Sequence, residues 1–556
     1  MRPDRAMPTK CPLSALACLP VLLACSPLPV SEPAPPAPLP SSVAAERCRA
    51  MAKTSVERLR ITTADWVDTG QVRARDPQGN REVGQPLPAH CLLRGRLDER
   101  VGTDGEPYHT GFELRLPAAG NGRLLYQGGG GNDGVLNMAV GRNTGALGWA
   151  DNGLQRGFAA VSTDAGHQSP APAFALDAQA REEHAWRAHW RTATTARSLF
   201  ERFYGRAPQH SYFIGCSGGG RQGMMFTQRF PELFDGVIAQ APAMRVSQGA
   251  TVAAAWTVQQ FAAIAPRDAD GRPVLAAALS DAQLKRVAAE IVDRCDAADG
   301  LADGIVADTA LCRVDVRKLA CPAAGENCLS AAQASALAAV MAGPVNRDGG
   351  RLYFSWPWDP GIAGPGWRAW TLGTSSTGAS DARHVTLMSG ALGFEFVTPP
   401  DPTLTVMNFD FERDPLRMER FHRVYGTADD VVLKAFQQRG GKLMLLHGMA
   451  DPIFSALETV DYQQRVNTAH GDVAASRFVR TFLVPGMNHC AGGPATDAFD
   501  GLAALVDWVE RGRPPDRLLA HGTALMPGIA RPLCPYPKIA RYRGGDTHRA
   551  DSFACR

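Results

Sequence analysis

Short apolar runs alternate with helical stretches along the middle of the chain, from Phe112 onward. Glu182–Phe203 has the length and spacing of an amphipathic helix. Buried strands separated by helices are typical of a mostly parallel sheet, so the pattern predicts an α/β fold. The strand-like runs are Gly122–Tyr126, Phe158–Ser162, Ser211–Ile214 and Val237–Ala239.

This alternation stops near Ala243 and returns only at Lys442–Leu446 and Phe478–Val484. The residues between are richer in Trp, Gly, Pro and Ser and show no clear strand alternation. An insertion between core strands often forms a lid over an active site. We therefore expect a first core segment at 44–243, a lid domain at 244–435 and a second core segment at 436–556.

The bulk composition is that of a globular protein. The chain has 556 residues, 45% hydrophobic and 20% charged, and is longer than one compact core usually serves. Lys and Arg number 58 against 55 Asp and Glu, a net charge of +3, and no basic run occurs. This balance argues against nucleic acid as a partner, and we expect no obligate protein partner.

The first 25 residues have the features of an export signal. Basic residues precede an apolar stretch, Cys11–Ala24, that is too short to span a bilayer. Its end, Leu22-Leu23-Ala24-Cys25, resembles a bacterial lipobox, in which the cysteine is lipidated and becomes the new N-terminus. We expect a lipoprotein anchored to the outer membrane through Cys25, with cleavage into the periplasm or the medium as the alternative. The proline-rich residues 26–43 would form an extended tether.

Cysteine usage agrees with export. Thirteen cysteines less the three at positions 11, 18 and 25 leave an even number, ten, which suits five disulfide bridges in an oxidising compartment. Scattered free thiols are the alternative, but exposed thiols are a liability outside the cell. The sequence alone does not fix the pairing, but short loops favour Cys321–Cys328 and Cys295–Cys312, and Cys534–Cys555 would tie down the C-terminus.

A candidate nucleophile lies between an apolar run and a helical run. Gly215, Ser217 and Gly219 form a G-x-S-x-G motif directly after Ser211–Ile214. In an α/β-hydrolase such a serine occupies a sharp, strained turn between strand and helix, where the crowded backbone requires small neighbours. A glycine-rich turn without chemistry is the alternative, but the strand-turn-helix context favours a nucleophile.

A serine hydroxyl needs a histidine to accept its proton and a carboxylate to orient that histidine. Of thirteen histidines, His489 is favoured because it follows the late run Phe478–Val484 in a glycine-rich loop. Asp451 follows Lys442–Leu446 in the same way. The resulting order, Ser217, Asp451, His489, is the order of the triad in α/β-hydrolases.

Two cysteines adjoin the candidate nucleophile and base. Cys216 precedes Ser217, and Cys490 follows His489. If the serine and the histidine meet, the two sulfurs must also come close, so a bridge Cys216–Cys490 would lock the two loops together.

The tetrahedral oxyanion of acyl transfer needs N–H donors. The backbone of Gly218 is one candidate, and the run Gly128–Gly131, from which we select Gly130 and Gly131, is the source of a second. Such a run could also cradle a phosphate, but no Lys-Ser or Lys-Thr follows it as in a P-loop.

Together these motifs resemble the tannase and feruloyl esterase family. The likeness runs from about Cys48 to Cys555 and implies an α/β-hydrolase fold with a lid, the bridge Cys216–Cys490 and a further bridge Cys48–Cys91. The segments that carry it are Gly215-Cys-Ser-Gly-Gly-Gly-Arg-Gln, Val161-Ser-Thr-Asp-Ala-Gly-His, His447-Gly-Met-Ala-Asp and Gly486-Met-Asn-His-Cys.

The resemblance also implies a structural calcium ion in the lid. The segment Asp296–Ile305 looks like the calcium loop of the family, and glycines let such a loop wrap around an ion that takes six to eight oxygens. The loop lacks the bidentate Glu of an EF-hand, and an unliganded Asp-Gly turn is the alternative. The implied ligands are the side chains of Asp296, Asp299 and Asp303 and the carbonyls of Leu301 and Ile305.

The C-terminal half looks most like members of the family that hydrolyse a terephthalate half-ester. Shared runs include Trp356-Pro-Trp-Asp-Pro and Arg531-Pro-Leu-Cys-Pro. By that likeness Arg383 would bind the free carboxylate, and Trp370 and Phe454 would flank the aromatic ring. A surface ion pair of Arg383 with Asp381 is the alternative. Leu387, where the relatives carry an aromatic residue, and Gly218, where they carry a larger one, depart from the pattern.

We therefore expect a serine carboxylic ester hydrolase that acts on small aromatic esters, preferably mono(2-hydroxyethyl) terephthalate, which it would cleave to terephthalate and ethylene glycol. A feruloyl esterase or tannase acting on plant phenolic esters is the first alternative. The second, from another class, is a non-catalytic, calcium-stabilised surface lipoprotein that binds aromatic acids.

Overall fold

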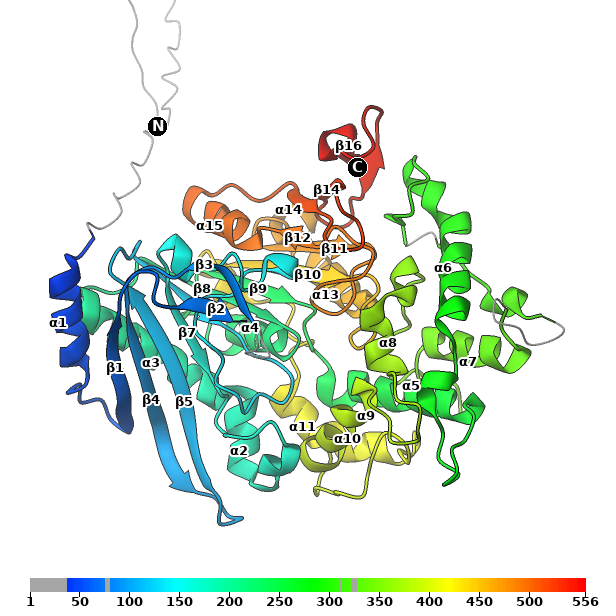
Figure 1. The fold of residues 1–556 in the computed structure, drawn as a ribbon, viewed down its shortest axis with the longest axis horizontal. Coiled ribbons are helices and arrows are strands. Elements are labelled where there is room, and N and C mark those ends of the chain that lie inside the picture. The colour runs from blue at the N-terminus through cyan, green and yellow to red at the C-terminus, as the bar shows by residue number, and fades with distance from the viewer. Residues whose placement is uncertain (1–37, 76–80, 310–311, 322–327) are drawn as a thin grey trace, which may run out of the picture. The chain divides into compact units, whose positions relative to one another are not determined.

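Nine strands form the central sheet of the computed structural model, which describes residues 38–75, 81–309, 312–321 and 328–556 (Figure 1). Strands β6 to β11 pair in parallel, whereas β1, β4 and β5 form an antiparallel extension at one edge. The expected α/β fold is therefore confirmed. In spatial order the strands are β1 (Leu59–Val67), β4 (His90–Val101), β5 (Pro107–Pro117), β7 (Ala159–Thr163), β6 (Arg123–Gln127), β8 (His210–Cys216), β9 (Gly236–Gln240), β10 (Lys442–Gly448) and β11 (Val479–Val484).

Each apolar run expected as a strand forms one, within a residue or two at its ends. The antiparallel strands β1, β4 and β5 were not expected from the apolar pattern. In β5 the reason is a pair of charged residues on one face, Glu113 and Arg115, which are both buried and lie 2.7 Å apart as an ion pair. Because the two charges neutralise each other, they can be buried in the strand, but they interrupt the apolar pattern from which a strand would be predicted.

Successive residues of β8 pack on opposite faces of the sheet, as the twofold repeat of a strand requires. Phe213 joins a core with α3 (Ala188–Tyr204), α4 (Gly218–Arg229) and α13 (Ala456–His470). Tyr212 and Ile214 join a second core, with α15 (Gly501–Arg511). The sheet is thus covered on both faces. The remaining elements outside the lid are α1 (Ser41–Met51), α2 (Ala178–Glu182), α12 (Lys434–Gln438), α14 (Asp472–Ala475), β2 (Arg73–Arg75), β3 (Glu82–Pro86), β12 (Ala498–Phe499), β13 (Leu518–His521), β14 (Ala530–Leu533), β15 (Ala540–Tyr542) and β16 (Phe553–Cys555).

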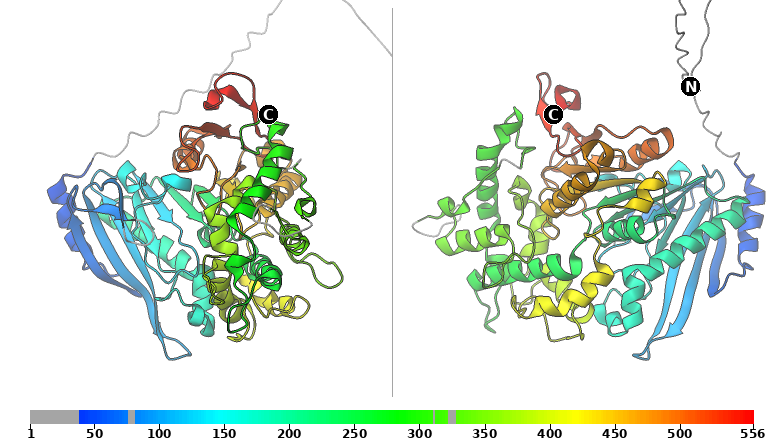
Figure 2. Two further views of the ribbon diagram at one scale, coloured as in Figure 1. Left: turned by 45° about the vertical axis from the view of Figure 1, so that its right-hand side comes forward. Right: turned by 180° about the vertical axis from the view of Figure 1, so that it is seen from behind.

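The residues between β9 and β10 are helical and build a core of their own, which includes Phe261, Trp367, Leu392 and Phe421. No strand of a sheet occurs between β9 and β10 in the described residues. Figures 1 and 2 show these green to yellow helices gathered on one side of the sheet, as a large inserted lid. The helices are α5 (Thr251–Ile264), α6 (Asp281–Cys295), α7 (Ala331–Ala342), α8 (Pro365–Thr371), α9 (Arg383–Thr386), α10 (Met388–Gly390) and α11 (Asp414–Tyr425).

Five disulfide bridges join the same cysteines that the sequence paired. Two of them lie in the lid, one ties α1 to β4, and one links residues near the C-terminus. The fifth spans 274 residues and joins the end of β8 to the loop after β11. The pairs are Cys48–Cys91, Cys216–Cys490, Cys295–Cys312, Cys321–Cys328 and Cys534–Cys555.

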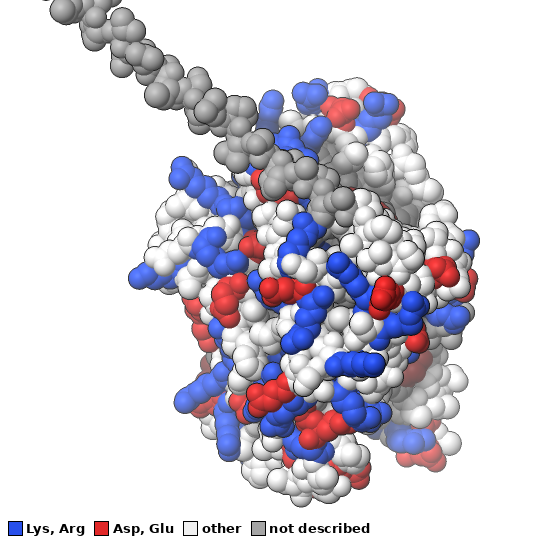
Figure 3. Space-filling view, turned by 90° about the vertical axis from the view of Figure 1, so that its left-hand side faces the viewer, with Lys and Arg blue, Asp and Glu red and all other residues white. Residues whose placement is uncertain are grey.

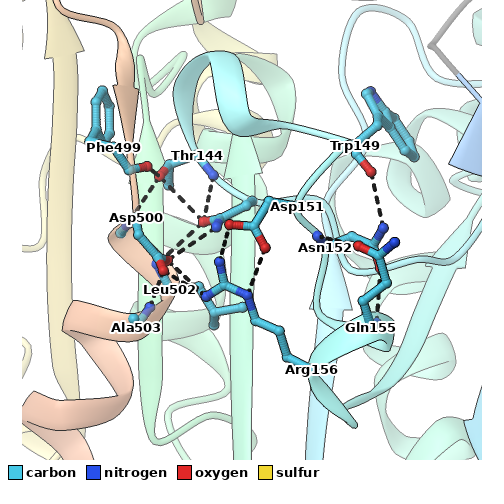
Figure 4. A network of polar contacts seen from close by, with 12 residues as sticks. Thr144, Trp149, Asp151, Asn152, Gln155, Arg156, Phe499, Asp500, Leu502 and Ala503 are labelled. Carbon is cyan, nitrogen blue, oxygen red and sulfur yellow. Dashed lines mark hydrogen bonds and ion pairs between the residues drawn. The ribbon is translucent and has the colours of Figure 1, made fainter. Parts of the chain in front are cut away.

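The connection between β6 and β7 is tied to the start of α15 by a polar network (Figure 4). Arg156 forms ion pairs with Asp151 and Asp500, the latter at 2.8 Å. The Thr144 hydroxyl donates to the Phe499 carbonyl at 2.9 Å. The first and second core segments, which the lid separates in sequence, are therefore joined by hydrogen bonds at this end of the sheet.

Basic and acidic side chains are interspersed on the face shown in Figure 3. Among the residues the structure describes, no helix is both long enough and apolar enough to cross a membrane. The expected export signal, Cys25 and most of the expected tether lie outside the described residues.

Candidate active site

Ser217 occupies the turn between β8 and α4, with a φ of 66°. A positive φ is costly for a residue with a side chain and marks a strained turn of the kind that presents a nucleophile. The flanking glycines are required by packing. A Cβ on Gly215 would lie 2.4 Å from the Gly219 oxygen, and a Cβ on Gly219 would lie 2.5 Å from the Gly129 oxygen. The glycines of the motif therefore make this sharp turn sterically feasible.

His489 and Asp451 are in contact. The Nδ1 of His489 lies 2.7 Å from Oδ2 of Asp451, and both residues follow the carboxyl ends of neighbouring strands, β11 and β10. The other oxygen, Oδ1, accepts backbone N–H groups from Ile453 at 2.9 Å and Phe454 at 3.1 Å. Asp451 is therefore fixed by its own loop and aims one oxygen at the imidazole.

Two histidines keep the Asp451 carboxylate charged. Burial by itself would raise the pKa of this carboxyl, but the charge of His489 and hydrogen bonds from His447 and His489 hold the pKa well below its usual range. The sequence did not single out His447, whose Nε2 lies 3.5 Å from Asp451 Oδ2. An ionised carboxylate here favours the His489 tautomer that leaves Nε2 free to accept a proton.

The bridge Cys216–Cys490 connects the nucleophile turn to the histidine loop. The two Cα atoms are 6.0 Å apart, and each cysteine is the chain neighbour of Ser217 or His489. Gln240, at the end of β9, donates from Nε2 to the Cys490 carbonyl at 2.5 Å. Ser217 and His489 line the same pocket, which has a volume of about 490 Å³.

The glycine run packs against the start of α4. A Cβ on Gly218 would lie 3.2 Å from Gly130 Cα and 3.4 Å from the Gly131 oxygen. The Gly130 N–H already donates to Asp133 Oδ1 at 2.8 Å. Gly130, Gly131 and Gly218 all line the pocket beside Ser217, so the hydrogen bond of the Gly130 N–H is what distinguishes the two glycines of the run. Of the two glycines expected from this run, Gly131 is thus the better candidate for an oxyanion donor.

Of the three expected substrate contacts, Trp370 and Arg383 lie in the lid, and Phe454 follows β10 in the core. The rings of Trp370 and Phe454 lie 5.3 and 5.5 Å from the His489 ring, centroid to centroid. The Arg383 guanidinium carbon is 5.6 Å from the centre of the Trp370 ring. All three line the pocket, and so does Leu387.

Asp381 is not the partner of Arg383. Its carboxylate accepts N–H groups from Thr374 at 2.7 Å and Ser375 at 2.9 Å, and it also bonds the Thr374 hydroxyl. No ion pair of Arg383 occurs within the described part of the chain. The guanidinium is therefore left facing the pocket and the Trp370 ring.

A polar group that the sequence did not suggest forms another part of the pocket wall. It consists of His184, Arg221, Glu395 and Tyr425, all buried, and all lining the pocket. Only Arg221 belonged to a recognised motif, and no spacing in the sequence connects the other three. They are brought together by a contact between the lid and the short helical turn Glu183–Arg187.

The expected calcium loop begins in a short helical turn, Asp296–Asp299, and carries buried acidic groups. Oδ1 of Asp296 is buried and has no hydrogen-bond partner in the described chain. Burial and the charges of Asp303 and Asp296 raise the pKa of Asp299 to about 6. An unpartnered carboxylate oxygen among mutually repelling carboxylates fits a bound divalent cation.

Two further observations bear on this loop. Asp303 forms an ion pair with Arg531, which offsets part of the negative charge. Within the described residues, no three His, Cys, Asp or Glu side chains are arranged to hold a metal ion by themselves. The backbone carbonyls expected as ligands, from Leu301 and Ile305, would therefore have to complete the coordination.

Comparison with known proteins places the chain in a family. Residues 99–556 match the family model described as tannase and feruloyl esterase. The chain is 42% identical to mono(2-hydroxyethyl) terephthalate hydrolase of Piscinibacter sakaiensis over 517 residues, which cover 84% of this chain and 85% of the relative. It is 29% identical to a probable feruloyl esterase B-1 of Aspergillus terreus, over 78% of this chain and 80% of that protein.

The fold is shared as well. The crystal structure of feruloyl esterase B from Aspergillus oryzae superimposes with a TM-score of 0.76 at 25% identity, and the match covers 92% of this chain and all of that chain. These similarities favour an enzyme over a non-catalytic binding protein. The chain belongs to the tannase and feruloyl esterase family and is a carboxylic ester hydrolase with an α/β-hydrolase fold.

Proposed function

We propose that the chain hydrolyses aromatic carboxylic esters through a triad of Ser217, His489 and Asp451. The observation that carries the proposal is the arrangement of two loops. His489 is held by Asp451 at 2.7 Å and is bridged, through its neighbour Cys490, to the residue before Ser217. Nucleophile, base and orienting acid then stand in the order and roles of a serine hydrolase.

In the first step, Ser217 Oγ attacks the ester carbonyl while His489 Nε2 accepts the hydroxyl proton. The tetrahedral intermediate collapses to an acyl-enzyme, and the alcohol leaves with the proton from His489. A water molecule then attacks the acyl carbon with His489 again as base, and the acid and free Ser217 are released. Asp451 stays ionised throughout and stabilises the imidazolium.

The N–H groups of Gly218 and Gly131 would bind the oxyanion of the intermediate. Gly218 is the first residue of α4, where unpaired N–H groups and the helix dipole favour negative charge. The run Gly128–Gly131 can lie close to Gly218 because it has no side chains. A Cβ on Gly218 would lie only 3.2 Å from Gly130 Cα. Each such donor typically contributes on the order of 100-fold to kcat.

The preferred substrate is an aromatic half-ester such as mono(2-hydroxyethyl) terephthalate. Arg383 faces the pocket and would form a charge-assisted pair with the free carboxylate of the acid, while Trp370 and Phe454 bound the space beside the imidazole. The name of the relative at 42% identity agrees with this choice. Esters of plant phenolic acids are the second candidate, supported by the names of the feruloyl esterases that the chain resembles.

The choice is tested by measuring kcat/KM for mono(2-hydroxyethyl) terephthalate and for methyl ferulate, which has no carboxylate, in wild-type and Arg383→Ala protein. Loss of the guanidinium should lower the value for the half-ester by about 10- to 100-fold and that for methyl ferulate by less than threefold. Unchanged turnover of the half-ester in Arg383→Ala would remove the reason for preferring it. Ser217→Ala should abolish both activities and serves as the control for chemistry.

We further propose that a calcium ion bound by Asp296, Asp299, Asp303 and the carbonyls of Leu301 and Ile305 stabilises the lid. When bound, the ion would neutralise the carboxylates, and it takes no part in the reaction.

Export, with or without a lipid on Cys25, is supported by the five disulfide bridges, which persist in oxidising compartments. Mass spectrometry of the mature N-terminus would establish whether Cys25 is lipidated.

A further inference from the structure

Glu395 is a buried carboxylate on the wall of the reaction pocket. It lies in the helical turn Ala391–Phe396 of the lid, and its side chain is fully buried. One oxygen, Oε1, accepts a hydrogen bond from His184 Nδ1 at 2.6 Å. The other, Oε2, has no hydrogen-bond partner among the described residues. A buried oxygen without a partner costs free energy unless a ligand or water bonds it, so it marks a place where a ligand could donate.

The surroundings of Glu395 keep it an acceptor. Burial by itself would raise the pKa of this carboxyl, but the charge of His184, its hydrogen bond and the nearby Tyr425 hydroxyl lower the pKa below the ordinary value. His184 is in turn 3.0 Å from the Tyr425 hydroxyl, which donates to the Arg181 carbonyl. An ionised carboxylate can only accept hydrogen bonds, so its unpaired oxygen selects for a donor.

The pocket therefore carries opposite charges on the same lid segment. Arg383 begins α9, and Glu395 follows twelve positions later, with both side chains on the pocket wall. A substrate carboxylate is attracted by the guanidinium and repelled by the glutamate. A neutral hydroxyl, in contrast, can donate to the glutamate without a charge conflict. This asymmetry orients a substrate that has a hydroxyl.

We propose that Glu395 determines specificity by accepting a hydrogen bond from a hydroxyl group of the ester substrate. The inference rests on the proposed hydrolysis at Ser217 and deepens it, because it adds a second recognition element to the pocket. The hydroxyl could belong to the acid, as in a phenol, or to the alcohol, as in a hydroxyalkyl ester. A site built to bond a hydroxyl discriminates against the analogue without it, since its buried oxygen is then left unpaired.

Two matched pairs of esters test the proposal and locate the hydroxyl. Methyl 4-hydroxybenzoate and methyl benzoate differ in the acid, whereas 2-hydroxyethyl benzoate and propyl benzoate differ in the alcohol. In wild-type protein, kcat/KM should favour the hydroxylated member of at least one pair by about tenfold or more. Equal values within both pairs would overturn the proposal without the need for any variant.

Glu395→Gln is the principal variant, because it keeps the shape and removes the charge. It should reduce the preference for the hydroxylated ester about tenfold and change kcat/KM for the unhydroxylated partner by less than threefold. Glu395→Asp, which keeps the charge but withdraws the oxygen by one methylene, should reduce the preference as well. A preference that persists in both variants would show that the His184–Glu395 pair only holds the lid to the core.

Glu183→Gln is the matched control. Glu183 is also buried, its Oε2 also has no hydrogen-bond partner, and it neighbours His184, but it is not among the described residues that line the pocket. The preference for the hydroxylated ester should be unchanged in this variant. Ser217→Ala tested on all four esters separates the two proposals, since activity that survives it contradicts the triad whatever the result at Glu395.

Discussion

The core side and the lid side of the pocket are built differently. On the core side, Ser217, Asp451 and His489 follow the carboxyl ends of parallel strands, and a disulfide bridge and backbone hydrogen bonds hold their loops. On the lid side, Arg383 and Glu395 lie on short helical turns of an insertion that has its own core. The proposed catalytic groups thus lie at the edge of the sheet, whereas the proposed substrate contacts lie on an insertion, a part of the fold that tolerates variation.

The largest expected effect is on the core side. Asp451→Asn keeps the size of the side chain but permits the wrong tautomer of His489, so kcat should fall by roughly 10⁴-fold. Because the triad acts on every substrate, the fall should be similar for mono(2-hydroxyethyl) terephthalate and for methyl benzoate. Initial rates at saturating substrate, with circular dichroism to verify folding, provide the measurement. A fall in kcat confined to substrates with a carboxylate would contradict the assignment of catalysis to the core side and of substrate selection to the lid side.

Removing one disulfide on each side gives a matched comparison. Cys216→Ala with Cys490→Ala opens a link of 274 residues beside Ser217 and His489, whereas Cys321→Ala with Cys328→Ala opens a link of only 7 residues within the lid. The core pair should cost about 3–5 kcal/mol of stability and lower kcat at least tenfold, because both loops lose their tether. The lid pair should cost less and leave kcat within about twofold. Urea titration and steady-state kinetics measure both, and equal losses of kcat would contradict the expectation.

Calcium removal should affect the stability of the lid and leave the chemistry intact. Treatment with a chelator should lower Tm by several degrees, and calcium should restore it, because an ion that binds the folded state stabilises it by mass action. In Asp296→Asn protein the response of Tm to calcium should be much weaker. Scanning calorimetry with and without the chelator is the measurement. A Tm that does not respond to the chelator in wild-type protein would contradict the calcium site.

The smallest effect is expected from an added contact on the lid side. Leu387→Phe would place an aromatic ring on the pocket wall and should raise kcat/KM for mono(2-hydroxyethyl) terephthalate by roughly two- to tenfold through ring packing. The value for an aliphatic ester such as ethyl acetate should not rise. A similar rise for both esters would show that Leu387 acts on the catalytic groups and not on the substrate ring.

Most of the core side could be predicted from the sequence because its signals are local. The apolar runs correspond to β6 to β11, and Ser217, His489 and Asp451 each directly follow one of these strands. Gly215 and Gly219 are recognisable because the chain at this turn has no room for a Cβ. The cysteine beside Ser217 and the cysteine beside His489 predict from the sequence alone that two distant loops are in contact.

Other features had no local signal. The strand β5 was missed because Glu113 and Arg115 neutralise each other inside the sheet. Gly131 is preferred to Gly130 as an oxyanion donor because the Gly130 N–H already donates to Asp133, a contact that the sequence does not indicate. Arg383 does not pair with Asp381 because the backbone of Thr374 and Ser375 donates hydrogen bonds to the aspartate, and the sequence does not indicate this turn.

The sequence by itself determined the α/β fold, the family, the candidate triad and the pairing of the two cysteines beside Ser217 and His489, because each is recorded by short motifs or by regularly spaced residues, whereas the bridge Cys48–Cys91 was implied only by the family resemblance. Only the tertiary structure brought His184 of the core to Glu395 of the lid, 211 positions away, and left one carboxylate oxygen of that pair without a partner. Such a contact depends on how two separately formed hydrophobic cores pack against each other, and no short stretch of sequence records that packing.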